Sequence, residues 1–266
     1  MELADRHVVI TGAGSGIGCA LATRIAAERP RALVVADLDE GAAQAVAAEI
    51  GAVAVATDVS REAEIRSLVT RARELHGRID LFCSNAGVTG PVGGPEAPDD
   101  EWQRTWEINV MAHVWAARAV LPEMVARGDG YLLSTASAAG LLTQVSALAY
   151  TATKHAAVAV AEWLAISYAD AGIKVSCLCP QGVRTPMLDA VLQDPVGAAP
   201  LLAEGVLEPA EVAEAVIEGI AAEQFLILPH RAVARHMALK AAEPERWLAG
   251  MRRIVREARA SGAPPS

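Results

Sequence analysis

Tyr150 and Lys154 are the two side chains whose types and spacing most directly suggest chemistry in this chain. Residues at i and i+4 of a helix share one face, with Cβ atoms about 5–6 Å apart. A phenol has an ordinary pKa of about 10, so a nearby cation must lower that pKa before the phenolate can act as a base. The phenolate could take a proton from an alcohol, and the phenol could return one to a carbonyl. The pair therefore favours an enzyme that transfers a proton at an alcohol oxygen.

Ser137 follows a predicted strand, and its hydroxyl could hold a substrate oxygen as charge develops there. Taken singly, Ser137 is an ordinary turn residue, and Tyr150 with Lys154 is a common exposed pair. The conjunction of the three, together with a glycine-rich turn and an acid further upstream, makes hydride transfer the leading hypothesis.

The glycine-rich turn Thr11–Gly18 follows a predicted strand and opens a predicted helix. In that setting backbone N–H groups and the helix dipole can hold a pyrophosphate. Its spacing is Gly-x-x-x-Gly-x-Gly, which does not match the common Gly-x-Gly-x-x-Gly dinucleotide pattern. The alternative is a tight turn that needs glycine only for a positive φ.

Asp37 ends the second predicted strand, about 20 residues beyond Gly18. A carboxylate there would accept a hydrogen bond from a ribose 2′-hydroxyl and repel a 2′-phosphate, which favours NAD over NADP. Ser15 and Leu38 occupy the places where an Arg or Lys would reverse that preference. The alternative is that Asp37 simply caps the following helix.

Seven short apolar runs alternate with longer helical patterns. Because both faces of each run are apolar, they are typical of a parallel sheet covered by helices on both sides. The fold class is therefore predicted as α/β, a single-domain, Rossmann-like doubly wound fold with about seven strands. The predicted strands are His7–Thr11, Ala32–Ala36, Val53–Ala56, Asp80–Ser84, Tyr131–Ser134, Lys174–Cys179 and Phe225–Leu228.

Helices are predicted over residues 39–50, over 61–76 with Ser60 as the cap, and from Pro209 to Ile220. Two longer helices, about 99–126 and 147–171, should lie side by side and could form an oligomer surface. A Gly- and Pro-rich loop is expected at 89–98. The domain spans residues 1–260, with a mobile substrate lid at about 187–208, whose alternative is a mere surface insertion, and a disordered tail at 261–266.

Composition excludes several classes of protein. A net charge of −9 without a basic cluster argues against nucleic-acid binding. Four arginines, at 252, 253, 256 and 259, are predicted to lie on the solvated face of a C-terminal helix. We expect no signal peptide, no membrane span and no metal site, and a cytoplasmic protein whose four cysteines are free thiols. The histidines at 76, 113, 155, 230 and 236 are taken as structural, because none is spaced with a second metal ligand.

The chain resembles the short-chain dehydrogenase/reductase family over nearly its whole length. The residues that match are the glycine turn Thr11–Gly18, Asp37, Asp58, Asn85-Ala86-Gly87, Asn109, Ser137, Tyr150, Lys154 and the segment Pro180–Thr185. The resemblance implies that Ser137, Tyr150 and Lys154 are catalytic and that Asn109 supports a water-linked proton relay through the lysine. It also implies an NAD(P)-dependent alcohol/ketone oxidoreductase that forms a homotetramer or homodimer.

The same resemblance, with the strand ends described above, assigns cofactor binding to one set of residues. These are Gly12, Ser15, Gly16, Ile17, Gly18, Asp37, Leu38, Asp58, Val59, Asn85, Ala86, Gly87, Tyr150, Lys154, Pro180, Gly182, Val183 and Thr185. One departure is that Gln181 stands where the family commonly has glycine after the proline. The nicotinamide contacts carried over to Val183 and Thr185 keep their spacing.

These observations predict an NAD-dependent enzyme that interconverts a secondary alcohol and its ketone, on a hydrophobic substrate of medium size. Residues that flank the catalytic groups or begin the lid are expected to line the substrate pocket: Val88, Thr89, Ala138, Gln144, Val145, Met187, Leu188 and Leu192. Two alternatives stay open, a catalytically silent NAD-binding sensor or scaffold, and an enzyme of the same fold that dehydrates or epimerises.

Overall fold

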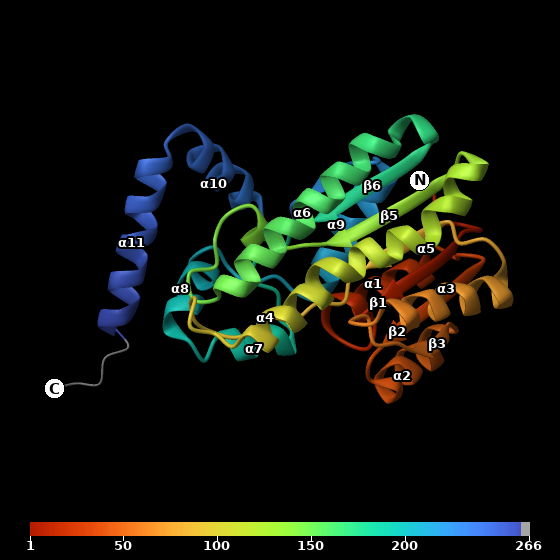
Figure 1. Cartoon of the computed structure of the whole chain (residues 1–266), viewed down its shortest axis with the longest axis horizontal. Coiled ribbons are helices and arrows are strands. Elements are labelled where there is room, and N and C mark those ends of the chain that lie inside the picture. The colour runs from red at the N-terminus through yellow and green to blue at the C-terminus, as the bar shows by residue number, and fades with distance from the viewer. Residues whose placement is uncertain (262–266) are drawn as a thin grey trace.

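A seven-stranded, all-parallel sheet forms the centre of the computed structural model, which describes residues 1–261 (Figure 1). The strand order is β3-β2-β1-β4-β5-β6-β7. The strands β2 and β3 are thus added on one side of β1, and the strands β4 to β7 on its other side. This confirms the predicted α/β fold of about seven strands. The strands are β1 (His7–Thr11), β2 (Ala32–Asp37), β3 (Val53–Ala56), β4 (Leu81–Ser84), β5 (Gly130–Thr135), β6 (Ile173–Leu178) and β7 (Leu226–Ile227).

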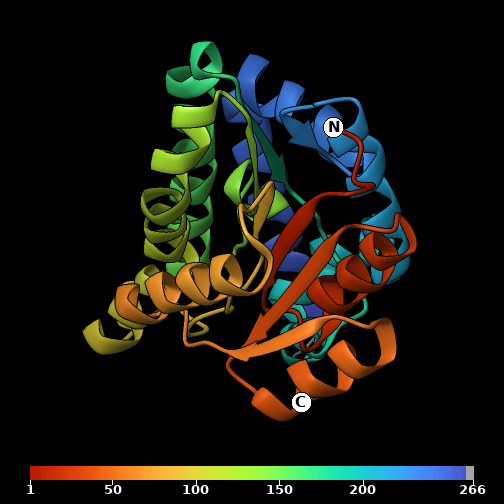
Figure 2. The same cartoon turned by 90° about the vertical axis from the view of Figure 1, so that its right-hand side faces the viewer.

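Helices cover both faces of the sheet, as Figure 2 shows with the sheet seen between the two layers. One layer consists of α3 (Glu62–His76), α5 (Ala112–Arg127) and α6 (Leu148–Tyr168). The other consists of α1 (Gly16–Ala27), α2 (Glu40–Ile50) and α9 (Pro209–Ala221). This double coverage explains why the strands are apolar on both faces.

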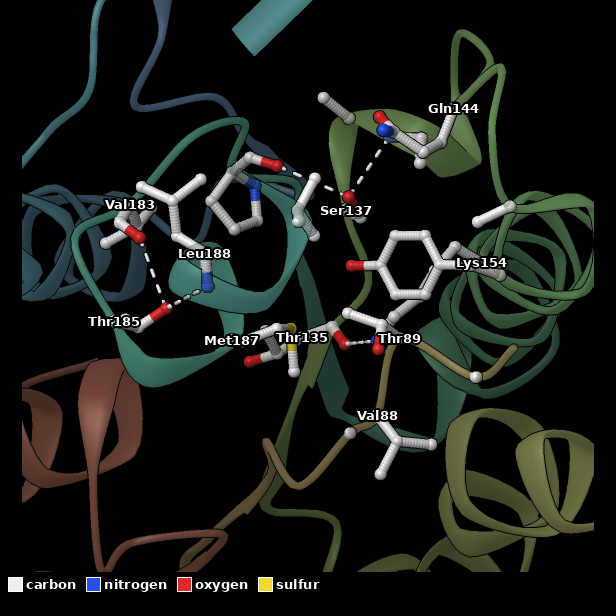
Figure 3. Close-up of a pocket in the computed structure, with 18 of the residues that line it drawn as sticks. Val88, Thr89, Thr135, Ser137, Gln144, Lys154, Val183, Thr185, Met187 and Leu188 are labelled. Atoms are coloured by element: carbon white, nitrogen blue, oxygen red, sulfur yellow. Dashed lines mark hydrogen bonds between the residues drawn. The ribbon is translucent and has the colours of Figure 1, made fainter. Parts of the chain in front are cut away.

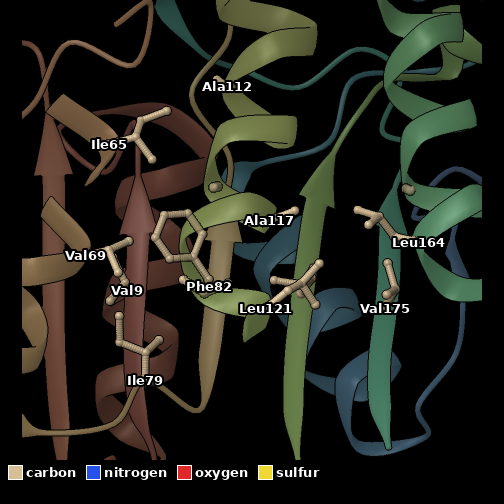
Figure 4. Close-up of a cluster of buried hydrophobic side chains, with 14 of the residues drawn as sticks. Val9, Ile65, Val69, Ile79, Phe82, Ala112, Ala117, Leu121, Leu164 and Val175 are labelled. Atoms are coloured by element: carbon tan, nitrogen blue, oxygen red, sulfur yellow. The ribbon is translucent and has the colours of Figure 1, made fainter. Parts of the chain in front are cut away.

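Successive residues of β1 point into two different cores. Val9 packs with Phe82 and Val69 on the α3 and α5 side, whereas Val8 and Ile10 pack on the α1 and α9 side. Figure 4 shows the first of these cores, with Phe82 between β1 and α5. A strand with period-2 side-chain alternation thus supplies both cores, and the sheet is fixed in one register.

The predicted long helix at 99–126 has an irregular middle. It consists of α4 (Asp99–Trp106), a π-helical turn η1 (Glu107–Met111) and α5, without a break in the chain. A π turn inserts one residue into a helix, and such turns are frequent at functional sites. Here η1 carries Asn109, which is fully buried.

The prediction that Ser60 caps the third helix was wrong. The N-cap of α3 is Arg61, and the Ser60 hydroxyl instead donates to Asp58 Oδ1 at 2.7 Å. Asp58 competes with the helix for the Ser60 hydroxyl. Its carboxylate lies only two residues away, and a hydrogen bond to a charged acceptor is stronger than the bond that a backbone N–H of the helix would donate to the hydroxyl.

The region predicted as a lid without clear periodicity contains two short helices, α7 (Pro186–Val191) and α8 (Pro195–Ala203). Each begins with proline, whose fixed φ suits the first turn of a helix. Beyond β7, α10 (Arg231–Ala242) and α11 (Pro244–Ser261) complete the chain, and α11 lies apart from the sheet beside α8 (Figure 1). Of the predicted tail 261–266, Ser261 ends α11 and the rest lies outside the described residues.

All four cysteines are free thiols, three of them buried, as predicted. The four arginines on α11 are exposed, which confirms a solvated face on that helix. Among residues 1–261 no helix is long and apolar enough to cross a membrane.

Candidate active site

The glycine turn after β1 is shaped by close backbone contacts. Gly12 has a φ of +65°, and a Cβ on it would lie 2.7 Å from Ala86 Cα. A Cβ on Gly18 would collide with the carbonyl oxygen of Gly12. Both positions therefore exclude side chains, and the turn leaves its backbone open to a ligand at the start of α1, where the helix dipole is positive.

Asp37 lies directly beside this turn. Its Oδ2 accepts the Gly14 N–H at 2.8 Å and its Oδ1 accepts the Asp39 N–H at 3.1 Å. The cap of the following helix is Asp39, whose side chain accepts from Ala42 N–H. The alternative role of Asp37 as the helix cap is thus wrong. Since each carboxylate oxygen has two lone pairs, Asp37 keeps acceptor capacity toward the pocket.

Asn85 ties three strand ends together. Its Nδ2 donates to the carbonyls of Thr11 and Gly12 at 3.1 and 3.2 Å, and its Oδ1 accepts from the Thr135 hydroxyl at 3.1 Å. The Thr11 hydroxyl also accepts from the N–H of Asn85 at 3.1 Å. This network fixes the carboxyl ends of β1, β4 and β5, the edge at which open α/β folds bind ligands.

A pocket of about 500 Å³ runs along that edge and joins the glycine turn to the side chains predicted to be catalytic, Ser137, Tyr150 and Lys154. All but one of the predicted cofactor residues line it, the exception being Gly182. Asn109 does not line it either. The cradle formed by the glycine turn and Asp37 fits a dinucleotide, whose pyrophosphate would lie against the turn and whose ribose would lie against the carboxylate.

Ser137, Tyr150 and Lys154 all line the other end of the pocket. Figure 3 shows Ser137 and Lys154 there, on the opposite side of the pocket from Val183 and Thr185. Ser137 follows β5, and its Oγ accepts the Ala139 N–H at 3.1 Å and donates to the Pro180 carbonyl at 3.5 Å. Lys154 Nζ lies 5.7 Å from the centre of the Tyr150 ring and donates to the Thr135 carbonyl at 3.1 Å. The three predicted catalytic residues are therefore brought together from two elements, the end of β5 and α6.

The pKa values of this cluster differ from their ordinary values. Burial raises the pKa of Tyr150, although the hydrogen bond from Ser137 opposes the rise. Burial also lowers the pKa of Lys154 to about 8. The prediction that Lys154, together with the nicotinamide ring of bound NAD⁺, lowers the Tyr150 pKa concerns the complex. In the protein without cofactor, desolvation of the phenol raises its pKa, and the ammonium donates to Thr135 and not to the phenol.

Asn109 holds the loop after β4 against α6. Its Oδ1 accepts the Val88 N–H at 3.0 Å, and its Nδ2 donates to the Val88 carbonyl at 2.9 Å and to the Thr153 hydroxyl at 3.1 Å. Next to it, a Cβ on Gly87 would lie 3.2 Å from Lys154 Nζ. The loop and the lysine thus approach closely because residue 87 is glycine.

His113, one helical turn after Asn109, is buried, and neither ring nitrogen has a hydrogen-bonding partner among the described residues. Burial first, and then the charge of Lys154, lower its pKa to about 3. The imidazole is therefore neutral at physiological pH. No sequence pattern connects His113 with the site, because the two are linked only through space, by the charge of Lys154.

The substrate side of the pocket matches the prediction in part. Val88, Thr89, Ala138, Gln144, Met187 and Leu188 line it as predicted. Val145 and Leu192 do not: Val145 faces a separate groove against α11, and Leu192 follows the end of α7 and is 37% exposed. The predictions for these two were wrong, since adjacency in sequence does not fix the direction of a side chain.

Several pocket residues were missed by the sequence analysis. Trp247, Met251 and Ile254 project from α11, and His236 from α10. The apolar spacing of Trp247, Met251 and Ile254 on one helix face is a signal that was present, but it does not reveal which surface the face covers. Arg104, on α4, and Thr135 were also missed.

Comparison with known proteins agrees with this geometry. The family model described as short chain dehydrogenase matches residues 6–195. The chain is 36% identical to a 1-deoxy-11-beta-hydroxypentalenate dehydrogenase of Streptomyces exfoliatus, with 93% of this chain and 95% of that protein covered. It is 32% identical to the estradiol 17-beta-dehydrogenase 11 of Rattus norvegicus, with 96% and 85% covered.

Solved structures of short-chain dehydrogenases also resemble this chain. A short chain dehydrogenase/reductase from Burkholderia phymatum in complex with NAD superposes with a TM-score of 0.85 at 32% identity, covering 92% of this chain and 96% of that one. A short-chain dehydrogenase from Sphingobium yanoikuyae in complex with NADPH gives 0.77 at 27% identity, covering 90% and 94%. The chain belongs to the short-chain dehydrogenase family. The predicted resemblance, and with it an oxidoreductase acting on the CH–OH group of its donor, is confirmed.

Proposed function

We propose that this protein is an NAD-dependent dehydrogenase that oxidises a hydrophobic secondary alcohol of medium size. The observation that carries the proposal is one continuous pocket, which joins Asp37 and the glycine turn at one end to Ser137, Tyr150 and Lys154 at the other. A protein that only bound NAD as a sensor or scaffold would have no use for a phenol, a serine hydroxyl and an ammonium gathered at one end of the pocket.

The side chains divide the proton chemistry among them. Ser137 orients the substrate oxygen, and Tyr150 accepts the hydroxyl proton. Lys154 holds positive charge near the phenol, which favours the phenolate, and holds the ribose. Asn109 keeps the Val88 loop in place beside Lys154 and serves the proton relay. Bound NAD⁺ would supply the hydride acceptor, and the reaction is reversible, with NAD preference favouring oxidation.

Asp37 supports a preference for NAD over NADP, because its carboxylate would repel a 2′-phosphate. No Arg or Lys stands in the glycine turn or directly after Asp37. Arg104 lines the same pocket, and its positive charge could attract a 2′-phosphate. The test of cofactor preference therefore has to include NADP⁺.

An apolar substrate is supported by the side chains around Tyr150 and under the lid. They include Val88, Leu142, Leu188, Val191, Leu201, Trp247, Met251 and Ile254. The relatives named for hydroxypentalenate and estradiol are consistent with this class of substrate. We therefore propose a cyclic or steroid-like alcohol, or an acyl derivative.

We also propose a cytoplasmic homotetramer or homodimer. Trp163 and Ile166 on α6 are 60% and 74% exposed, which gives the outer helix layer an apolar surface suited to a second copy. Light scattering after size exclusion would measure the assembly, and Ile166→Glu should reduce it if this surface is the interface. A monomer at all concentrations would contradict the assembly.

The decisive experiment is NADH formation at mildly alkaline pH across a panel of secondary alcohols, repeated with NADP⁺. Tyr150→Phe is expected to lower kcat/KM by about 10²–10⁴-fold, because it removes the general base. Tyr168→Phe, away from the pocket, is the matched control and should retain activity. Tight NADH binding without turnover of any alcohol would favour the sensor, and substrate conversion without net NADH would favour dehydration or epimerisation.

A further inference from the structure

Helix α8 of the lid is held over the pocket by two glutamine side chains from the body of the protein. Gln144 Nε2 donates to the Gly197 carbonyl at 3.0 Å, and Gln181 Nε2 donates to the Pro200 carbonyl at 3.2 Å. Both glutamines line the pocket. Gln144 lies in the segment between Ser137 and Tyr150, whereas Gln181 follows β6, so α8 is attached to both walls of the catalytic cleft.

The Pro200 carbonyl is free to accept this bond because it lies in the last turn of α8. The last four carbonyls of a helix lack intrahelical partners. The N–H that would ordinarily reach it belongs to Glu204, and that group donates to the Leu202 carbonyl instead. Gln181 therefore satisfies a helix end that would otherwise depend on water.

Gln181 is fixed by its own backbone. Its N–H donates to His230 Nδ1 at 3.1 Å. His230 Nε2 then carries the ring proton and donates to the Gly182 carbonyl at 3.0 Å. Burial lowers the pKa of His230 and keeps this neutral form. One histidine thus binds the backbone on both sides of the Gln181–Gly182 peptide, and this fixes the backbone from which the Gln181 side chain extends.

Gln144 is fixed in the same way from α6. Its N–H donates to the Thr151 hydroxyl at 3.0 Å, and that hydroxyl donates back to the Gln144 carbonyl at 3.0 Å. Thr151 is the neighbour of Tyr150. The position of the catalytic tyrosine and the position of the lid helix are therefore linked through two residues.

The docking surface of α8 requires a glycine. A Cβ on Gly197 would collide with the Ser146 hydroxyl oxygen and lie 3.1 Å from Gln144 Nε2. The helix can approach the 144–146 segment closely only because residue 197 has no side chain. At its far end, Glu204 contacts His236 of α10 at 2.8 Å, which supports α8 from the C-terminal side.

We propose that Gln144 and Gln181 are positioning residues that latch α8 over the substrate and set how tightly an apolar alcohol is retained. Gln181, where the family commonly has glycine, is the residue that adds the second attachment in this chain. The proposal rests on the dehydrogenase function for its kinetic consequences, but the latch itself is a property of the free protein.

Amide hydrogen exchange of residues 196–204, measured without substrate, tests the latch directly. Gln181→Met and Gln144→Met keep side-chain length but remove the donor. Each is expected to speed exchange about fivefold, and the double variant about 25-fold, as for the loss of one and two hydrogen bonds. Gln181→Glu, which cannot donate when ionised, should behave like Gln181→Met. Unchanged exchange in the double variant would overturn the proposal.

Gly197→Ala should unlatch the helix by steric collision. Its control is Gly250→Ala on α11, where an added Cβ meets nothing within 4 Å. The control should exchange like the wild type at 196–204. Equal exchange in the two variants would show that α8 does not depend on this contact and would count against the latch.

Kinetics distinguish the latch from the function on which it rests. In the glutamine variants we expect KM for an apolar alcohol to rise about fivefold per bond while kcat is not lowered and NADH affinity is unchanged. A collapse of kcat, or an equal loss of NADH affinity, would indicate general damage and overturn the positioning role. If no alcohol is turned over, the proposed function fails, and the exchange measurement still decides the latch.

Discussion

The two ends of the pocket are built in different ways. The cofactor end consists of the glycine turn 11–18, Asp37 and residues 85–87, which follow neighbouring strands of the sheet and are joined to one another by hydrogen bonds of the Asp37 and Asn85 side chains. The substrate end consists of α7, α8, α10 and α11, which are held mainly by side chains from distant segments. Fixed geometry at one end and latched helices at the other suit a common cofactor and a particular substrate.

His113, which is buried next to Lys154, tests how tightly the protein core behind the pocket is packed. The pKa of His113 falls from an ordinary 6.5 to about 3 on folding, so the unfolded chain binds its proton more tightly. As pH falls from 6.5 toward 3, the unfolded chain takes up this proton and the folded protein does not. The free energy of unfolding therefore decreases over that range, by up to about 5 kcal/mol, and is unaffected by this group above pH 6.5. His113→Leu should flatten the pH dependence of urea unfolding in that window relative to the wild type.

The prediction would be contradicted if the free energy of unfolding depended on pH in the same way in the wild type and in His113→Leu. That outcome would mean that the imidazole is hydrated or has a hydrogen-bonding partner in the native state, and that the core next to Lys154 is less tightly packed than its burial indicates.

The glycine turn gives the next effect in size. Gly12→Ala combines a positive φ with a Cβ 2.7 Å from Ala86 Cα. It should destabilise the protein by about 2–4 kcal/mol and weaken NADH binding, as measured by thermal unfolding and calorimetry. Gly128→Ala, with a φ of +70° and nothing within 4 Å, isolates the backbone strain and should cost about 1–2 kcal/mol without changing NADH affinity. Equal effects would refute the role of close approach.

Asp37→Asn should change cofactor choice and leave substrate binding alone. The variant loses a charge that favours the ribose hydroxyls and opposes a 2′-phosphate, so KM for NAD⁺ should rise about tenfold and the preference over NADP⁺ should shrink. Asp39→Asn, which keeps the helix cap, is the control. An unchanged ratio of kcat/KM for the two cofactors would show that Arg104 or another group sets the preference.

The smallest effect belongs to the substrate end. Met251→Ala removes apolar surface that lines the pocket from α11, so KM for an apolar alcohol should rise about threefold to tenfold with NADH affinity unchanged. Leu248→Ala, on the same helix but outside this pocket, should leave KM as it is. A matching loss in both variants would mean that α11 acts through stability and does not contact substrate.

The comparison also explains what the sequence could reveal. Asp37, the glycine turn and the Tyr150–Lys154 pair are local patterns with fixed spacing on strands and helices, and the structure brings them to one edge. The roles of Trp247 and His236 depend on where α10 and α11 fold back, and the role of Gln181 depends on where α8 lies, which no local period encodes. The raised pKa of Tyr150 was likewise beyond sequence reasoning, because burial is a property of the assembled site.

Thr185 contacts both ends of the pocket, the helix α7 at one end and the glycine turn at the other. Its hydroxyl caps α7 by accepting the Leu188 N–H at 3.3 Å, and its methyl carbon would lie 3.0 Å from a Cβ on Gly16. The first turn of the proposed lid therefore starts against the glycine turn, the surface proposed to receive the pyrophosphate. Such an arrangement favours an ordered sequence of events, in which the dinucleotide enters first and leaves last, and product inhibition patterns at steady state would display that order.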